Sequence, residues 1–358
     1  MASTEQQVAE EKLKTIIDPH TDTDLVSGNN VKRIETNDDG VIEIEIELGY
    51  PASSWHPELR AMIEKAIPGA QVSVSSNTVS HEVQEGIKPL PGVKNIIAVA
   101  SGKGGVGKST LSVNLALALS AEGARVGILD ADIYGPSQPR MLGISGQPKS
   151  KDGKTLEPMT SHNLQAMSIG FLVDEESPMI WRGPMVTQAL EQLLKDTQWD
   201  NLDYLIIDMP PGTGDTQLTL AQKVPVSGSV IVTTPQDIAL LDARKAYKMF
   251  EKVEIPVLGV VENMSTHICS NCGHEEHIFG SGGGQNMAEQ YGTEFLGEVP
   301  LDRAIRESVD GGQPSVVSDP NGKIAATYRL IARRASARLA RRKKDFSAKF
   351  PNIVIQQN

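Results

Sequence analysis

The chain has 358 residues and a formal net charge of −11, with 39% hydrophobic, 22% charged and 4% aromatic residues. This length predicts two domains, and the composition is that of a globular protein rather than a disordered one. The only cysteines are Cys269 and Cys272, which excludes a disulfide scaffold. The first residues lack a basic start and an apolar stretch, and no apolar run reaches membrane-spanning length. We therefore expect no secretory signal, no membrane span and a reducing, cytoplasmic location.

Residues 1–80 are predicted to form a small α/β domain. Two stretches of strand length flank the sequence Asn-Asp-Asp-Gly, which is typical of a β-hairpin turn. The second stretch alternates Ile with Glu, so we expect one buried face and one solvated face. The predicted elements are a helix over 6–17, strands over 31–36 and 41–48, a helix over 57–66 and a strand over 72–78.

The pattern changes after residue 93. Residues 81–93 contain two Pro and two Gly without periodicity, and they are predicted to be a linker. Beyond them, near-continuous apolar runs alternate with helical stretches, which is typical of a parallel sheet buried on both faces. We therefore expect a doubly wound, mostly parallel α/β domain over 94–358. Its predicted strands cover 96–100, 126–131, 164–169, 204–209, 230–234 and 257–261.

A glycine-rich sequence joins the first of these strands to a helix. It matches the pattern G-x-x-x-x-G-K-[ST] from Gly102 to Ser109. Glycines let backbone amides turn toward phosphate oxygens, Lys108 reaches the β- and γ-phosphates, and the Ser109 hydroxyl ligates Mg²⁺. The sequence therefore predicts an ATP site in a P-loop domain. The predicted nucleotide-binding residues are Gly102, Lys103, Gly104, Gly105, Val106, Gly107, Lys108, Ser109 and Thr110.

Three aspartates follow apolar strands of the same domain. Asp130 and Asp132 come at the end of the run 126–131, and Asp208 comes near the end of the run 204–209. A carboxylate in this place beside a P-loop holds the Mg²⁺ shell, and we assign that role to Asp208. Each aspartate alone is also consistent with a cap at a strand end. Together with Lys108, they predict a site for ATP hydrolysis that needs no covalent nucleophile.

A second lysine, Lys103, lies inside the loop. In this feature the sequence resembles the deviant Walker A family of dimeric ATPases, which includes the MinD, ParA and Mrp/ApbC proteins. The resemblance implies a homodimer in which Lys103 reaches the nucleotide of the partner. It also implies that Asp130 and Asp132 form a switch pair, with Asp132 orienting the attacking water. Asn263, at the end of a late strand, would hydrogen-bond adenine or, alternatively, be an ordinary turn residue.

The two cysteines have the spacing C-x₂-C in a polar loop with three histidines. An iron–sulfur cluster takes four thiolates, so two chains would have to supply them, in agreement with a dimer. A zinc site within one chain would use Cys269, Cys272, His274 and His277, although this spacing is shorter than that of a zinc finger. A redox dithiol requires a helix after the pair, which the sequence does not favour. An inert surface pair is the remaining alternative, and we favour the cluster.

With the C-x₂-C pair in addition to the two-lysine P-loop, the sequence resembles more specifically the Mrp/ApbC (Nbp-type) iron–sulfur cluster carriers. This implies that Cys269 and Cys272 hold a [4Fe–4S] cluster bridged between two subunits, for transfer to apo iron–sulfur proteins with the help of other cluster assembly factors. The first domain resembles the small iron–sulfur assembly domain, on residues 18–22 and 48–51. It has no cysteine, although some relatives of that domain have one, so we treat it as a recognition module.

Residues 323–350 contain ten basic residues and one acidic residue, whereas residues 1–90 contain 16 acidic and 7 basic ones. A basic helix is predicted over 325–344. Such a helix suits a ParA- or MinD-like spatial-organising ATPase that binds DNA or membrane, and this is one alternative function. A P-loop ATPase with a structural zinc loop is another. Residues 325–344 contain no Trp or Phe. We therefore expect the helix to pack on the sheet with its arginines in water and the acidic domain nearby. We expect no nucleic-acid binding and no stable membrane binding.

Overall fold

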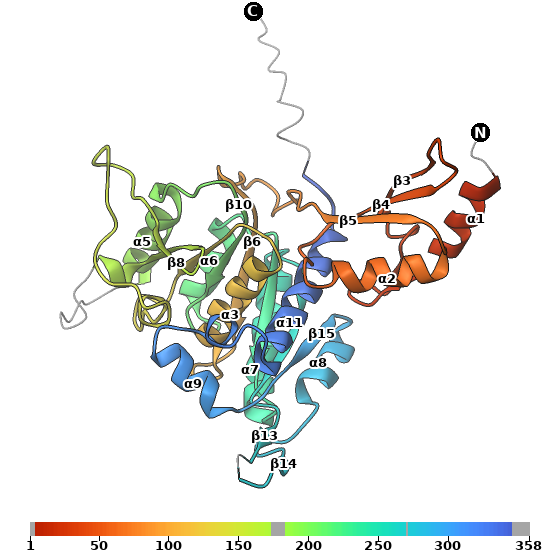
Figure 1. Cartoon of the computed structure of the whole chain (residues 1–358). Helices are drawn as coiled ribbons and strands as arrows, with labels where there is room; N and C mark the ends of the chain where they lie inside the picture. The colour runs from red at the N-terminus through yellow and green to blue at the C-terminus, as the bar shows by residue number, and fades with distance from the viewer. Residues whose placement is uncertain (1–3, 173–182, 270, 346–358) are drawn as a thin grey trace, which may run out of the picture.

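The computed structural model describes residues 4–172, 183–269 and 271–345. It contains a large α/β unit built on an eight-stranded sheet and a smaller unit built on a three-stranded sheet, which lies beside one end of the larger unit (Figure 1). The predicted α/β fold class is confirmed. Among the described residues, no helix combines the length and apolar character needed to cross a membrane.

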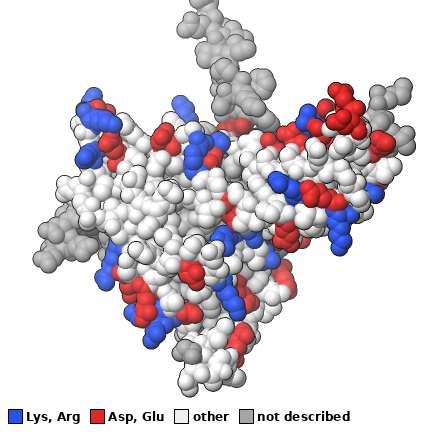
Figure 2. All heavy atoms as spheres, viewed as in Figure 1, with Lys and Arg blue, Asp and Glu red and all other residues white. Residues whose placement is uncertain are grey.

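The smaller unit has its own apolar core. Strand β4 (Ile42–Leu48) pairs antiparallel with β3 (Val31–Thr36) and parallel with β5 (Gln71–Ser76). Ile44, Ile46 and Leu48 of β4 are buried while its glutamates are partly exposed, as the alternation predicts. Helices α1 (Thr4–Leu13) and α2 (His56–Ala66) contribute Leu13, Leu59 and Ile63 to this core. Acidic side chains gather around the end of the β3–β4 hairpin in Figure 2.

The predicted first helix, 6–17, is wrong at its C-terminal end. Helix α1 ends at Leu13, and strand β1 (Ile17–Asp18) pairs with β2 (Thr23–Asp24) instead. Backbone pairing with a later segment therefore overrides the helical spacing of the apolar residues at this point.

The large sheet has the order β15-β12-β11-β6-β10-β7-β9-β8, and only β8 is antiparallel to its neighbour. The predicted strands are all present within a few residues. Two edge strands were not predicted: β8 has only three residues, and the sequence of β15 mixes Glu and Gly with apolar residues. The strands are β6 (Val93–Ser101), β7 (Val126–Asp130), β8 (Met159–Ser161), β9 (Leu164–Ser168), β10 (Leu202–Asp208), β11 (Gly228–Thr233), β12 (Val257–Asn263) and β15 (Glu294–Val299).

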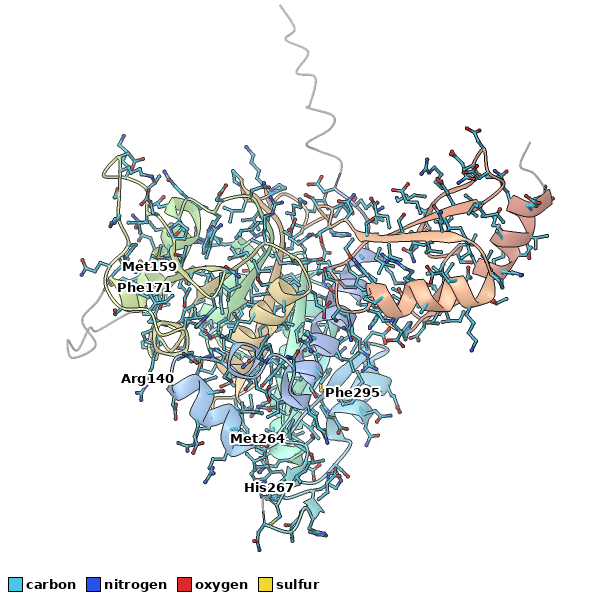
Figure 3. The ribbon with its side chains drawn as sticks, viewed as in Figure 1. Arg140, Met159, Phe171, Met264, His267 and Phe295 are labelled. Atoms are coloured by element: carbon cyan, nitrogen blue, oxygen red, sulfur yellow. The ribbon has the colours of Figure 1, made fainter. Side chains whose placement is uncertain are left out.

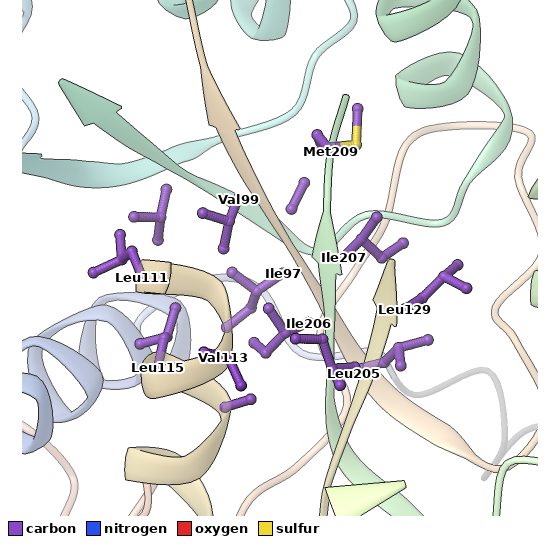
Figure 4. Close-up of a cluster of buried hydrophobic side chains, with 14 of the residues drawn as sticks. Ile97, Val99, Leu111, Val113, Leu115, Leu129, Leu205, Ile206, Ile207 and Met209 are labelled. Carbon is purple, nitrogen blue, oxygen red and sulfur yellow. The ribbon is translucent and has the colours of Figure 1, made fainter. Parts of the chain in front are cut away.

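Helices cover both faces of this sheet (Figure 1). They are α3 (Lys108–Ala121), α4 (Gln138–Met141), α5 (Gly183–Asp196), α6 (Asp215–Lys223), α7 (Asp237–Lys252), α8 (Gly283–Tyr291), α9 (Arg303–Asp310), α10 (Ser315–Ser318) and α11 (Lys323–Ala340), with a 3₁₀ turn at Ile169–Phe171. Figure 4 shows Leu111 and Leu115 of α3 against Ile97 of β6. All three are at most 1% exposed, and burial of each such side chain contributes about 1.5–3 kcal/mol.

Helix α11 joins the two units. Tyr328, Ile331 and Leu339 pack in the large core, whereas Ala337 packs in the core of the small unit. The prediction that its arginines lie in water is wrong for Arg333, whose side chain is 15% exposed and bonded to Glu122. The helix also ends at Ala340 rather than at residue 344. Arg333 also donates to His20 Nε2 and Ser54 Oγ of the small unit, so the basic helix lies against the acidic domain, as predicted.

The predicted linker, 81–93, lies against the large unit. Gln84 Nε2 donates to the carbonyl oxygens of Ala221 and Val224, at 2.8 and 3.1 Å. His81 pairs with Lys344 in an isolated antiparallel bridge, so the segment after α11 lies next to the start of the linker. Two chain segments therefore run together where the two units meet.

Candidate nucleotide site and cysteine hairpin

The P-loop connects the end of β6 at Ser101 to the start of α3 at Lys108. Two of its glycines require their residue type. Gly107, the residue before α3, has φ +83°, and a Cβ there would lie 2.1 Å from Asn263 Nδ2. A Cβ on Gly102 would lie 2.0 Å from the backbone of Asp242 in α7. The loop is therefore packed between β12 and α7, with the N-terminus of α3 available for an anion.

Lys108 and Asp208 face each other at the centre of the site. Their Nζ and Oδ1 atoms are 2.5 Å apart, and the two side chains are 6% and 0% exposed. Lys108 Nζ also lies 3.2 Å from Ser109 Oγ, and Ser112 Oγ donates to Asp208 Oδ1 at 2.9 Å. The pairing follows from topology, because β6 and β10 are parallel neighbours whose carboxyl ends meet at one edge.

Asp130 and Asp132 lie at the same edge. Asp130, which has no exposed surface, sits opposite Asp208 in the β7–β10 pairing. Its Oδ2 accepts from the amides of Ser137 and Gln138 at 2.9 and 3.0 Å. Burial, followed by the charge of Asp208, raises the pKa of Asp130 to about 7. Asp132 is half-buried, its amide donates to Asp130 Oδ1, and burial raises its pKa. Three carboxyl groups thus lie at one edge of the sheet, and a cation bound there would favour the charged forms of Asp130 and Asp132.

Gln138 is a site residue that the sequence did not indicate. Its side chain is 1% exposed, and Nε2 donates to Asp208 Oδ2 at 2.9 Å and to the carbonyl oxygen of Ser109 at 3.1 Å. It is the first residue of the short helix α4, directly after a stretch of Gly, Pro and Ser that follows Asp132, and no motif marks it. Gln138 is recognised as a site residue only because the fold brings it beside the P-loop.

The remaining predicted residues surround the loop. Lys103 is half-buried, and its ammonium forms no ion pair with any residue that the structure describes. Gly104 and Gly105 are exposed, whereas Val106 is buried and Thr110 half-buried. Asn263 Nδ2 donates to the carbonyl oxygen of Val106 at 2.8 Å, and its Oδ1 accepts from the amide of Met264. Asn263 therefore lies against the loop and fixes its conformation.

The cysteines lie on a hairpin that projects from the large unit, at the end opposite the small unit (Figure 1). Strands β13 (His267–Ile268) and β14 (Glu275–Glu276) form its base, and Figure 3 shows His267 beyond Met264, which follows β12. The amide of Cys269 donates to His274 O at 2.9 Å, and the amide of Gly273 to Cys269 O at 2.8 Å. This turn places both free thiols at one tip, with Cys272 exposed and Cys269 partly exposed.

Backbone amides favour the thiolate at this tip. The amides of Asn271 and Cys272 are the main cause that lowers the pKa of Cys269. Since thiolates are the metal-binding form of cysteine, the turn prepares Cys269 for a metal centre. The strand β14 follows the pair in place of the helix that a redox dithiol requires.

The histidines nearby are engaged elsewhere. The Nδ1 atoms of His267 and His277 each lie 3.0 Å from a carbonyl oxygen, of Leu301 and Ser265 respectively. Within the described ranges, no three His, Cys, Asp or Glu side chains come together as a metal site. The contact of His277 with Ser265 involves Nδ1 alone, so a zinc site would have to use its Nε2 atom.

The chain matches two family models. Residues 92–336 match the ParA model, described as the NUBPL iron-transfer P-loop NTPase, and residues 6–80 match a model of iron–sulfur cluster assembly proteins. The chain belongs to the iron-transfer P-loop NTPase family.

Relatives of this NTPase extend over both units. An iron–sulfur cluster carrier protein of Haemophilus influenzae is 49% identical over 346 residues, which cover 95% of this chain and 93% of the relative. One of Escherichia coli K12 is 55% identical over 306 residues, 83% of each chain. The mouse iron–sulfur cluster transfer protein NUBPL is 51% identical over 254 residues, which cover 70% of this chain and 80% of that protein.

A solved structure resembles the P-loop unit of this NTPase. It is a nucleotide-binding protein of Archaeoglobus fulgidus in complex with ADP. The two sequences are 38% identical, the TM-score is 0.56, and the match covers 64% of this chain and 90% of that protein. The cell division ATPase MinD of Pyrococcus furiosus has a TM-score of 0.50 at 22% identity, over 67% of this chain and 97% of its own. The second similarity concerns the fold alone.

Proposed function

We propose that this NTPase is an ATP-dependent iron–sulfur cluster carrier, which holds a [4Fe–4S] cluster between two subunits and delivers it to apo-proteins. The observation that carries the proposal is the pair of accessible thiols, Cys269 and Cys272, on a hairpin of a P-loop unit. A cluster requires four thiolates and one chain offers two, so two hairpins complete the set. The naming of close relatives as cluster carriers supports the same function.

Exposed apolar side chains near the hairpin support a homodimer. Ile238 and Leu241 on α7 are 69% and 55% exposed, and Ile268 and Ile278 beside the cysteines are about half exposed. Large apolar side chains in solvent mark protein contacts when they gather on one face. Since α7 also packs against Gly102, such a contact would bring the partner close to the P-loop, where Lys103 is placed to reach the nucleotide of the other subunit.

The ATP site uses charge and positioning. Phosphoryl transfer requires neutralisation of the phosphates and an oriented water, for which we assign Lys103, Lys108 and Asp132. The donor set at the edge of the sheet consists of hydroxyl and carboxylate oxygens, which suits the hard cation Mg²⁺. Ser109 would ligate the ion and Asp208 would hold its shell, and a bound Mg²⁺ would neutralise phosphate charge. Asn263 lies beside the P-loop, and we assign it to the adenine.

The small unit, residues 1–80, serves in this proposal as a recognition module for recipient proteins or assembly factors, with 81–93 as the connection to the carrier unit, 94–358. Free thiols that bind a cluster fit the reducing cytoplasm. The alternative of a DNA- or membrane-binding ATPase is disfavoured by the contacts of α11. Arg333 and Arg338 lie 3.0 and 3.1 Å from the carboxylates of Glu122 and Glu294, which occupies part of the basic surface.

The test is anaerobic reconstitution with iron and sulfide, followed by metal analysis, absorption spectroscopy and determination of the oligomeric state. We expect about four iron and four sulfide per dimer. Cys269→Ser should lose the cluster and keep ATP binding, whereas Lys108→Ala should lose ATP binding and keep the cluster. A zinc-bound monomer that takes up no iron would overturn the proposal, and loss of ATP binding in Cys269→Ser would indicate a structural role for the cysteine.

A further inference from the structure

We propose that Gln138 is a positioning residue for the metal in the nucleotide site. Its Nε2 group holds Asp208 in place, and its Oε1 atom accepts a hydrogen bond from a water molecule of the magnesium shell. This inference rests on the proposed function of the site as a binding site for Mg²⁺ and ATP. It concerns a side chain that neither the sequence motifs nor the assigned roles include.

The orientation of the Gln138 amide follows from its neighbours. Asp208 Oδ2 and the carbonyl oxygen of Ser109 lie within 3.1 Å of one end of the amide, and both are hydrogen-bond acceptors. The donating NH₂ group must therefore be at this end. Oε1 is then directed away from both acceptors. The amide has one fixed orientation rather than two equivalent ones.

The second atom of the amide lacks a partner. Gln138 Oε1 is buried and has no donor among the residues that the structure describes, and the same is true of the hydroxyl of the adjacent Ser137. Buried acceptors in folded proteins are paired in the great majority of cases. An orphaned acceptor beside the P-loop therefore indicates that a ligand of this site supplies the donor.

The chemistry of the ligand limits what this donor is. The phosphate oxygens of ATP are acceptors, so they cannot pair with Gln138 Oε1. Water bound to a cation is a strong donor and the ordinary companion of Mg²⁺ in phosphate sites. Gln138 contacts Asp208 and Ser109, the two residues assigned to the ion, whereas Asp132 is assigned to the attacking water. From the position of the amide, we infer that the donor to Oε1 is a water molecule bound to the metal.

The same amide also stabilises Asp208 when Lys108 leaves this carboxylate to bind the phosphates. In the structure, Lys108 and Ser112 bond Oδ1 of this buried carboxylate, and Gln138 bonds Oδ2. When Lys108 turns to the phosphates, only Ser112 and Gln138 remain as donors of these three. A buried polar group requires hydrogen-bond partners, so Gln138 holds the Asp208 carboxylate in its orientation.

The experiment measures metal-dependent nucleotide binding by the full-length protein. A fluorescent ATP analogue is titrated in Mg²⁺ and again in EDTA, and the nucleotide-bound protein is titrated with Mn²⁺ by electron paramagnetic resonance. Gln138→Met keeps the shape of the side chain and removes both polar atoms. We expect it to weaken Mn²⁺ binding by about tenfold or more, the usual effect of losing a group that orients a metal ligand, with binding in EDTA unchanged.

Gln217→Met is the matched control. Gln217 is also buried, at 2% exposed, and its Oε1 also lacks a partner among the described residues, but its Nε2 donates to Pro210 O and not to Asp208. The two glutamines therefore differ in their contact with Asp208 and Ser109, which is the feature that the inference requires. It should leave Mn²⁺ affinity unchanged. If Gln138→Met does not fold, Gln138→Asn, whose shorter amide cannot reach both acceptors, should show the same metal-specific loss. Equal Mn²⁺ affinity in a folded Gln138 variant and the wild type overturns the inference, as does equal weakening with and without metal. Failure of the wild type to bind the analogue at all would overturn the proposed function instead.

Discussion

Glu122 accepts a hydrogen bond from Arg333 Nη1 at 3.0 Å, and the same Nη1 donates to Ser54 Oγ of the small unit at 2.6 Å. The pair thus connects the small unit to the helix that starts at the P-loop. Glu122 directly follows α3, which begins at Lys108 and has 14 residues, so the two sites are about 20 Å apart along one helix. The carboxylate of Glu122 also accepts from the amide and the hydroxyl of Ser54 in the small unit, at 2.9 and 2.6 Å. The far end of the nucleotide-binding helix is therefore the docking point of the small unit.

Removing the guanidinium from this contact should loosen the small unit. Arg333→Met removes the nearer of the two cations beside the fully buried Glu122 and leaves Arg329, whose Nε lies 4.0 Å from the carboxylate. Breaking a buried pair costs about 3–5 kcal/mol. The hydrogen bonds from Ser54 remain, so we expect the lower end of this range. Denaturant unfolding and limited proteolysis of the region 1–80 measure the effect.

The control for this variant is Arg306→Met. Arg306 pairs with Asp310 at 3.4 Å on the surface, where both side chains are more than half exposed, and such pairs contribute about 0–1 kcal/mol. A similar loss of stability in both variants would contradict the special role of the contact between Glu122 and Arg333.

Stability should fall in mild acid because of His81. Burial lowers the pKa of this histidine in the folded protein, relative to 6.5 in an unperturbed chain. Below about pH 6.5 the unfolded chain therefore binds more protons than the folded one, and the free energy of unfolding decreases as the pH falls. His81→Asn keeps a donor toward Asn95 and should make the decrease in stability less steep. Part of the decrease should remain, because burial also lowers the pKa of His56. The measurement is denaturant unfolding between about pH 5 and 8. An unchanged slope in the variant would show that His81 titrates normally.

Cys269 should react as a thiolate at lower pH than an unperturbed thiol. The amides of Asn271 and Cys272 stabilise the charged form and lower its pKa. Alkylation of the apo-protein with iodoacetamide, followed by peptide mass spectrometry, should give a pH midpoint at Cys269 below that of N-acetylcysteine. A midpoint equal to that of the model thiol would mean that the hairpin does not hold the turn in solution. Cluster loading should then protect both cysteines from the reagent.

Lys103→Ala should separate binding from hydrolysis. Lys103 is half-buried in the loop, but its proposed contact is with the nucleotide of the partner, so nucleotide affinity should change by less than about threefold. Cationic groups supplied to phosphoryl transfer accelerate it by roughly 10³–10⁵-fold, and hydrolysis should fall by at least about a hundredfold. Steady-state ATPase assays and equilibrium binding test this. Lys248→Ala, an exposed lysine paired with Glu251 on α7, is the control, and full activity in Lys103→Ala would contradict a role in trans.

The sequence predicted the P-loop and the central strands because their signals are local. A continuous apolar run by itself predicts a strand that is buried on both faces of the sheet. Such a run is present in β6, β7, β10, β11 and β12. β15 lacked it, since Gly297 and two glutamates interrupt the run. Gln138 was beyond prediction for a different reason. Its significance arises from contact with Asp208, 70 positions away in the chain, and no spacing rule connects the two. The same holds for Glu122 and Arg333.

The position of Ala337 in the core of the small unit has a consequence for biosynthesis. The small unit is translated first, but a residue that completes its packing lies on α11, which is translated after the whole P-loop sheet. During translation the front unit therefore exposes an incomplete apolar surface until the last helix leaves the ribosome. The contact between the two units can therefore be completed only once α11 has been synthesised.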